Sequence, residues 1–235
     1  MLPKLNDVPG YDDIIPSTGQ KIKFRPYLVK EEKILLLAME SQDTKTALNA
    51  IADTVVSCIH EDIDRRSLTV FDIEYLFLRI RSKSVGERSN LNLKCSECGA
   101  YNEFTLNLED IKLDIPKTNF KIKLTDQISL VMKWPSYVDV ASSPRVSQST
   151  SATEQAFAVI INCIESIQTE EENILAKDVP ESELTEFIES MNTEQYRAVT
   201  EFMKSIPKLH HDVEFDCTAC GHRNKIELDG ITDFF

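Results

Sequence analysis

Alternating polar and apolar residues mark several pairs of short strands along the chain. Two pairs lie in "DIIPSTGQKIKFRPYLV" and "FKIKLTDQISLVMKWPSYV", and two more flank the cysteines in "LNLKCSECGAYNEFTLNL" and "VEFDCTACGHRNKIEL". A period of two residues is typical of strands, and turn-forming residues between two such runs indicate a hairpin. We therefore predict four β-hairpins.

Apolar residues at helical spacing predict helices between these hairpins. The clearest run is "EEKILLLAME", Glu31–Glu40, and apolar stretches also surround Cys58 and Cys163. Three expected helices begin with residues at N-cap and N3 spacing: Thr69 with Asp72, Ser151 with Glu154, and Asn192 with Gln195. Together these strands and helices predict an α+β protein.

The order of these elements occurs twice. Each half has an "LPKLN" or "IPKTN" motif, a hairpin, a cysteine-bearing apolar helix, an amphipathic helix and a Cys-x-x-Cys-Gly turn, which we call a knuckle. The order is kept while the spacing drifts, as a duplication with insertions and deletions would give. We predict one repeat at residues 1–114, ending in the knuckle of Cys95 and Cys98, and a second at 115–235, ending in that of Cys217 and Cys220.

The second repeat departs from the first in one place. The stretch "ASSPRVSQSTSA", Ala141–Ala152, is polar and has no periodicity, so it indicates a loop. It stands where the first repeat has the helix Glu31–Glu40. We expect the second repeat to have lost or remodelled that helix.

Composition indicates a soluble globular protein made in the cytosol. Of its 235 residues, 42% are hydrophobic and 28% are charged. No apolar run approaches the roughly 20 residues needed to span a membrane, and the first residues lack the pattern of a signal peptide. In a reducing compartment, the six cysteines are expected to be thiols or metal ligands rather than disulfides.

The charge argues against a surface for duplex nucleic acid. Net charge is −13, and the segment Glu165–Ser190 holds nine carboxylates and one lysine. We interpret that segment as a solvated face, because nucleic-acid surfaces need clustered cations. The basic cluster "RIRSKSVGER" follows an apolar helix and fits a C-terminal turn that complements the helix dipole.

The two knuckles predict one structural zinc site. Zinc prefers four tetrahedral ligands, with thiolates at about 2.3 Å. Each knuckle offers two thiols on a tight turn, and the glycine after the second cysteine permits the positive φ that closes it. Neither knuckle supplies four ligands, so we expect Cys95, Cys98, Cys217 and Cys220 to share one Zn²⁺ per chain. The ion would join the two repeats and stabilise the fold.

Other interpretations of these residues remain. The knuckles could be redox dithiols, although neither opens a helix after a strand, or two separate sites, one of them assisted by His222. The first knuckle has Ala100 at the position of His222, so a symmetric pair of such sites fails. The remaining histidines are read as ordinary ones, namely His60, His210 and His211. The lone cysteines Cys58 and Cys163 are read as small buried hydrophobes.

Enzymatic activity is not expected. A catalytic zinc keeps an open coordination position, which four thiolates do not leave. The sequence contains no glycine-rich phosphate loop, no GxSxG and no HExxH motif. Its carboxylates are plentiful, but no recognisable motif places them.

The first 40 residues carry a family resemblance. The segment "LPKLNDVPGYDDIIPSTGQKIKFRPYLVKEEKILLLAMES" resembles a baseplate protein family of T4-like contractile-tailed bacteriophages, which has an "IPSTGxKIKxRPFLVKEEKILLxAxES"-type segment near the N-terminus. The matching residues are Ile15–Lys23 and Arg25–Ser41, with Tyr27 where the family often has Phe. The resemblance implies a structural or assembly role in the baseplate hub, with other hub or tail proteins as partners. It leaves open whether the protein stays in the finished virion.

Two functions from different classes follow from this reading. The first is a zinc-stabilised, duplicated interaction protein that builds or chaperones the baseplate hub, in the host cytoplasm or in the tail. The second is a zinc-ribbon protein that binds nucleic acid, for example a transcription accessory factor, since CxxC hairpins are common there. Only the second knuckle is modestly basic, with Arg223 and Lys225. We therefore prefer the first.

Two segments are candidate docking surfaces. The terminal Phe234 and Phe235 follow the turn at Asp229-Gly230, and they either fold back onto the core or form a docking tail. The hairpin Ile15–Val29 is the other candidate, because it carries the family resemblance.

Overall fold

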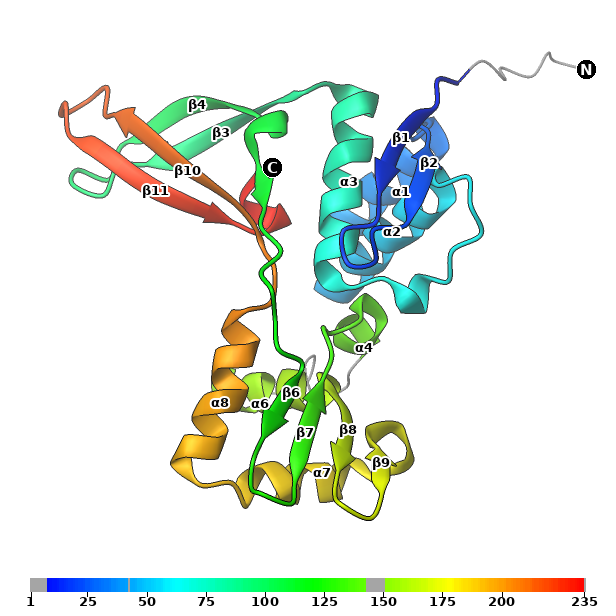
Figure 1. Cartoon of the computed structure of the whole chain (residues 1–235). Coiled ribbons are helices and arrows are strands. Elements are labelled where there is room, and N and C mark those ends of the chain that lie inside the picture. Colours follow the sequence, from blue (N-terminus) through cyan, green and yellow to red (C-terminus); the bar gives the residue numbers. More distant parts are fainter. Residues whose placement is uncertain (1–7, 42, 143–150, 235) are drawn as a thin grey trace, which may run out of the picture. The chain divides into compact units, whose positions relative to one another are not determined.

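The computed structural model describes residues 8–41, 43–142 and 151–234. The chain forms two compact units (Figure 1). Unit 1 consists of Met1–Arg65, Phe71–Asp114 and Pro207–Phe235, and unit 2 consists of Arg66–Val70 and Ile115–Ile206. One unit boundary coincides with the predicted repeat border after residue 114. The last segment of the second predicted repeat, however, folds with unit 1.

The first part of unit 1 is a hairpin with helices. Strands β1 (Tyr11–Ile14) and β2 (Lys21–Phe24) pair antiparallel, as the alternating pattern predicts. Ile22 and Phe24 are buried, while Lys21 and Lys23 are exposed. The elements that follow are α1 (Val29–Glu40), α2 (Thr44–Cys58), the 3₁₀ turn η1 (Arg65–Ser67) and α3 (Val70–Val85).

The second part of unit 1 contains the two knuckle hairpins. Strands β3 (Arg88–Lys94) and β4 (Tyr101–Asn107) form a two-stranded sheet, while β5 (Lys112–Leu113), β10 (Leu209–Asp216) and β11 (Arg223–Asp229) form a three-stranded one. The 3₁₀ turns η2 (Leu108–Asp110) and η4 (Ile231–Phe234) follow the hairpins. One apolar cluster joins both sheets to α3, and it consists of Leu78, Leu91, Leu93, Leu106, Leu108, Leu209, Val213, Leu228 and Phe234.

The two knuckle hairpins share one design. Their strands pair over seven positions each, and the innermost pairs are Lys94 with Tyr101 and Asp216 with Arg223. Strands β4 and β11 also have the same sequence of exposed and buried residues. Equivalent side chains of β4 and β11 therefore face the same kind of surroundings.

Unit 2 is an antiparallel sheet with helices. The sheet has the order β6 (Lys121–Lys123), β7 (Ser129–Met132), β8 (Ile164–Gln168) and β9 (Asn173–Leu175). The helical elements are α4 (Tyr137–Ser142), α6 (Ala152–Asn162), η3 (Ala176–Asp178), α7 (Glu181–Glu189) and α8 (Thr193–Lys204) (Figure 1). Buried residues from the sheet and from α6, α7 and α8 form a single apolar cluster.

A matching contact ties a hairpin to a cysteine-bearing helix in each half of the sequence. The Arg25 N–H donates to the Cys58 carbonyl at 2.9 Å, and the Lys133 N–H donates to the Cys163 carbonyl at 2.7 Å. The adjacent residues are antiparallel partners in both halves: Phe24 with Ile59, and Met132 with Ile164. Both cysteines are fully buried, which confirms their reading as core residues.

Most predicted helix starts are confirmed. Asn192 and Gln195 form a reciprocal capping box at the start of α8, and the Ser151 side chain accepts a hydrogen bond from the Glu154 N–H. The predicted loop Ala141–Ala152 is wrong at its start, because α4 runs through Ser142. The signal missed there is Ser136, whose hydroxyl accepts a hydrogen bond from the Asp139 N–H in the first turn of α4. Residues 143–150 lie outside the described part of the chain.

Among the described residues, no helix combines the length and the apolar character needed to cross a bilayer.

Candidate metal centre

The four knuckle cysteines lie together at the tips of the two hairpins of unit 1. Their sulfur atoms all lie within 4.8 Å of one another. The Cys95 Sγ is 3.8 Å from the Cys220 Sγ, and the Cys98 Sγ is 3.6 Å from the Cys217 Sγ. Four thiolates bound tetrahedrally at about 2.3 Å from one ion would lie about 3.8 Å apart. The cluster therefore fits a metal ion, and these spacings are too long for a disulfide, which needs about 2.05 Å.

The same turn geometry presents the thiols in each knuckle. The Cys95 N–H donates to the Ala100 carbonyl at 2.8 Å, and the Cys217 N–H donates to the His222 carbonyl at 2.8 Å. The glycine after each second cysteine has φ of +73°, as predicted for a turn that only glycine adopts without strain. The first cysteine of each knuckle is buried and the second is exposed.

Asn102 connects the first hairpin to the second knuckle. Its Oδ1 accepts hydrogen bonds from the Thr218 N–H at 2.8 Å and the Thr218 hydroxyl at 3.0 Å. Its Nδ2 donates to the Ala100 carbonyl at 3.1 Å and lies 3.7 Å from the Cys217 Sγ. This buried amide therefore fixes the opposite knuckle and supports one of its sulfurs.

Asn224 makes the reciprocal set of contacts. Its Oδ1 accepts from the Ser96 N–H at 2.9 Å and from the Ser96 hydroxyl at 3.0 Å, and its Nδ2 lies 3.5 Å from the Cys95 Sγ. Such hydrogen bonds to ligand atoms orient a metal site and tune its charge. The crossed contacts give the knuckle pair an approximate two-fold symmetry.

Sequence reasoning missed the two asparagines, although the signal was present. Both knuckles extend the motif to Cys-[Ser/Thr]-x-Cys-Gly-x-x-Asn, with Asn102 and Asn224 at equivalent places. The hydroxyl residue after the first cysteine is the partner of the opposite asparagine. A repeated polar residue on the buried face of a strand indicates a specific partner, because a buried amide without hydrogen bonds is costly.

The thiols have unequal proton affinities. Backbone N–H groups of Cys220 and Ala219 lower the pKa of Cys217 to about 6, and those of Cys98 and Glu97 lower the pKa of Cys95. The largest single effect on the pKa of Cys220 is a hydrogen bond from the His222 N–H, which lowers it. Hydrogen bonds with the three neighbouring thiols, together with burial, outweigh this effect and raise the pKa of Cys220 to about 12. Negative charge thus concentrates on the buried pair, Cys95 and Cys217, and a bound cation would favour thiolates in the cluster.

The other candidate ligands are not in the cluster. Among the described residues, only the four knuckle cysteines come close enough together to hold a metal, so His222 adds no second site. The His211 Nδ1 lies 3.2 Å from the Asp110 carbonyl, and the His210 Nε2 lies 3.6 Å from Asp114. Burial raises the pKa of Cys163 to about 12, so this thiol stays protonated.

The structure corrects the two proposed docking segments. Phe234 is fully buried in the apolar cluster of unit 1, and its carbonyl accepts a hydrogen bond from the Ser89 hydroxyl at 2.7 Å. It is therefore a core residue, and Phe235 lies outside the described residues. The segment Ile15–Val29 is not one hairpin: Ile15 is buried in the turn, β2 ends at Phe24, and Val29 begins α1.

The fold and the cluster define a class of protein in which paired cysteine hairpins bring four thiols to one point. Comparison with known proteins adds the family. The family model for the T4 bacteriophage base plate protein matches residues 9–235, so the chain belongs to that family. A relative is the baseplate hub assembly protein gp26 of Enterobacteria phage T4, which is 23% identical over 218 residues, covering 92% of this chain and 94% of the relative. No solved structure matches the chain.

These matches confirm the resemblance seen in the opening segment and extend it to nearly the whole chain. A phage structural or assembly role, with other baseplate proteins as partners, follows from the family. The cysteine cluster is compatible with that role, since four thiols around one ion can hold a fold together.

Proposed function

We propose that this chain is a non-enzymatic structural component or assembly factor of the phage baseplate hub. The observation that carries the proposal is the family match over residues 9–235, supported by a relative of almost equal length whose name is that of a hub assembly protein. The arrangement of the four thiols supports a structural use of the metal, because a closed four-thiolate site leaves no position for a substrate.

We propose zinc as the ion and Cys95, Cys98, Cys217 and Cys220 as its ligands. Four thiolates in a tetrahedral arrangement favour zinc over magnesium or calcium, which prefer oxygen. The spacing of 3.6 to 3.8 Å between sulfurs of opposite knuckles fits zinc–sulfur bonds of ordinary length. The ion would supply positive charge that neutralises the thiolates, and the two asparagines would orient the sulfurs around it.

The proposed duplication is supported by contacts as well as by sequence order. The knuckle hairpins have equivalent registers, and the contacts of Arg25 with Cys58 and of Lys133 with Cys163 match. The second half differs mainly by β9, η3 and α7, which lie between its cysteine-bearing helix and α8. An insertion at that point accounts for the larger spacing between the later matches.

Nucleic-acid binding by the knuckles is the weaker alternative. Arg223 and Lys225, the cations of the second knuckle hairpin, both contact Glu214, at 2.8 and 3.5 Å. The Glu214 carboxylate therefore offsets one of these two charges on the hairpin itself, in a chain of net charge −13. A surface that attracts phosphates needs uncompensated cations.

Capture from infected cells tests the role in the hub. Tagged full-length chain, expressed during infection, should retain baseplate hub proteins, which mass spectrometry identifies. A Cys95→Ser and Cys217→Ser double variant serves as the comparison, because it loses the proposed metal and with it the stability of the two knuckle hairpins. Mass spectrometry of purified virions then separates a lasting component from an assembly factor that leaves. Capture of RNA polymerase or nucleic acid in place of hub proteins would contradict the proposal.

Metal analysis tests the site. Reduced full-length protein should contain about one zinc per chain, and X-ray absorption should give sulfur-only coordination. Cys58→Ala is the matched control, because this cysteine lies outside the cluster, and the variant should keep its zinc. Two ions per chain, or none in a folded sample, would show the single-site proposal to be wrong.

A further inference from the structure

Helix α1 has an unusual surface for a helix on the outside of a compact unit. Its inner side buries Glu31, Leu35 and Ala38. Around the rest of the helix, five apolar side chains each expose more than half of their surface: Val29, Ile34, Leu36, Leu37 and Met39. Soluble proteins seldom expose a large contiguous apolar patch. The outer face of α1 therefore indicates a contact with another surface.

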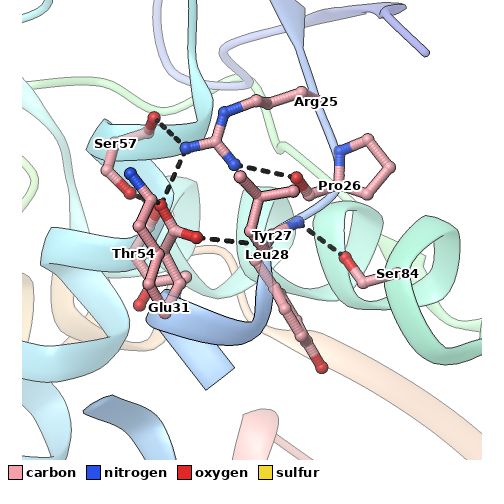
Figure 2. Close-up of polar contacts among 9 residues, drawn as sticks. Arg25, Pro26, Tyr27, Leu28, Glu31, Thr54, Ser57 and Ser84 are labelled. Atoms are coloured by element: carbon pink, nitrogen blue, oxygen red, sulfur yellow. Dashed lines mark hydrogen bonds and ion pairs between the residues drawn. The ribbon is translucent and has the colours of Figure 1, made fainter. Parts of the chain in front are cut away.

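A network of hydrogen bonds holds the start of this helix in place, as Figure 2 shows. The Glu31 carboxylate accepts from the Leu28 N–H at 2.9 Å and from the Arg25 guanidinium at 2.8 Å. The same guanidinium donates to the carbonyls of Pro26 and Ser57. Burial by itself would raise the pKa of Glu31, but the hydrogen bonds outweigh it and lower this pKa, so the carboxylate stays ionised.

A second tie reaches α3, since the Tyr27 N–H donates to the Ser84 hydroxyl at 2.9 Å (Figure 2). The helix is thus fixed to both α2 and α3 at its beginning. A face held in one orientation loses little conformational entropy when it docks, which favours association. The outer face of α1 is preorganised in this sense.

The order of residues along the face is self-complementary. When two copies of a helix pair antiparallel about a two-fold axis between Leu36 and Leu37, residues equally far from the axis meet, because the rise per residue is constant. Leu36 and Leu37 then lie beside their counterparts at the axis. Lys33 lies near Glu40 of the second copy, twice by symmetry. Among the described residues, neither Lys33 nor Glu40 forms an ion pair within its own chain, so both are available.

Charge also favours a second copy at this face. The chain carries a net charge of −13, so two molecules repel one another over most of their surfaces. The exposed charged residues of α1 balance, because Lys30 and Lys33 offset Glu32 and Glu40. Like-charge repulsion is therefore smallest where the apolar side chains are exposed.

We propose that the outer face of α1 binds a second copy of this chain as an antiparallel, two-fold symmetric dimer. The apolar side chains supply the contact, and the paired Lys33 and Glu40 set its direction. One short helix per copy buries less than the roughly 800 Å² per partner of a standard interface. The dimer should accordingly be weak and should weaken further in high salt, because its exposed ion pairs are screened. This proposal is independent of the metal site and of the hub assignment.

Charge reversal tests the dimer in the purified full-length chain. Sedimentation velocity from about 1 μM to about 1 mM covers the range in which a small interface associates. Lys33→Glu places two acidic pairs across the axis, and Glu40→Lys places two basic pairs there. Each should weaken dimerisation about tenfold, the effect of a change of about 1.4 kcal/mol. The double variant Lys33→Glu with Glu40→Lys recreates both opposite-charge pairs and should restore the dissociation constant of the wild-type dimer.

Two further variants complete the test. Leu37→Asp places a charge beside the axis and should leave only monomer. Lys21→Glu, an exposed lysine on β2 outside this face, is the matched control for charge reversal and should dimerise like wild type. Circular dichroism checks that each variant is folded.

Several results would overturn the proposal. A wild-type chain that is monomeric at every concentration means that another protein, or the second unit of the same chain, covers α1. A dimer that is unaffected by Lys33→Glu or Leu37→Asp uses a different surface. Single reversals that the double variant does not rescue mean that the two copies do not meet antiparallel at this site.

Discussion

In unit 2, a four-stranded sheet is covered by helices, and one apolar cluster includes Leu130, Met132 and Ile164. At the knuckle end of unit 1, two separate hairpins meet, and their tips contain thiols, amides and hydroxyls where unit 2 has apolar side chains. A sheet with a covered face is stable by itself, whereas a two-stranded hairpin is marginal in water. The comparison teaches that apolar burial alone holds one region, while at the knuckle tips cross-hairpin polar contacts and a proposed ion add to the apolar cluster of the hairpins.

The largest expected effect comes from removing one thiol. Cys95→Ser should destabilise both knuckle hairpins as strongly as Cys217→Ser, by more than about 3 kcal/mol, because either change opens the same proposed site. Hydrogen exchange read by mass spectrometry should rise in β3, β4, β10 and β11, while β6 to β8 stay protected. If each substitution affected its own hairpin alone, the knuckles would not share an ion.

A cavity in unit 2 should destabilise the sheet of that unit and leave the proposed metal site unaffected. Leu130 is fully buried in the sheet, so Leu130→Ala should cost about 2–4 kcal/mol. Exchange should rise in β6 to β8, and the zinc content should not change. Lys121→Ala on the neighbouring strand is the control, since that side chain is exposed and its removal should cost little. Loss of metal from Leu130→Ala would mean that the two regions are coupled.

Substitutions of the two asparagines test the polar contacts at the knuckles separately from metal binding. Asn102→Ala leaves the Thr218 N–H without its acceptor in a partly buried site, and Asn224→Ala does the same to Ser96. We expect each to cost about 2 kcal/mol while the zinc content stays at one ion. Thermal unfolding in zinc-saturated buffer measures this cost. Unequal costs for the two substitutions would contradict the approximate two-fold symmetry of the contacts.

The last expected effect depends on pH and concerns Glu74 on α3, beneath the C-terminal turn of the knuckle region. Burial raises the pKa of Glu74 to about 7 from its ordinary 4.5, although the Ile231 N–H opposes the shift. Between these two pH values the folded state binds more protons than the unfolded state, so stability falls as pH rises through this window.

The substitution Glu74→Gln removes this dependence on pH. It should raise the free energy of unfolding by about 2 kcal/mol more at pH 8 than at pH 5, because folded wild type is still protonated at pH 5. Urea titrations at the two pH values measure the difference. Glu103→Gln, an exposed carboxyl on β4, should produce no such change. Equal effects of Glu74→Gln at both pH values would show that charge is not the cause.

The sequence predicts best those structural features that depend on neighbouring residues. The hairpins, the helix caps of Ser151 and Asn192, and the knuckle turns with Gly99 and Gly221 depend on neighbouring residues, so pattern and turn chemistry predict them. The meeting of the four thiols was also predicted, because half a ligand set in one hairpin requires the other half elsewhere.

Long-range packing was not predictable in the same way. The burial of Phe234 depends on Ser89, 145 residues away, and no local pattern reports that contact. Similarly, Arg66–Val70 joins unit 2 because Thr69 pairs with Ser136. The outward apolar residues of α1 were read as a helix, but a helical pattern alone does not say which faces a fold will leave uncovered.

The pairing of β5 with β10 has a consequence for the order in which the chain folds. Leu113 lies opposite Leu209, so the points where the chain leaves unit 1 and returns to it are neighbours. Closing a flexible loop as long as the 119 positions between Cys98 and Cys217 carries an entropic penalty that grows with the logarithm of loop length. If unit 2 condenses first, it acts as a short rigid link that delivers the second knuckle to the first. Folding of unit 2 would then precede the assembly of the four thiols.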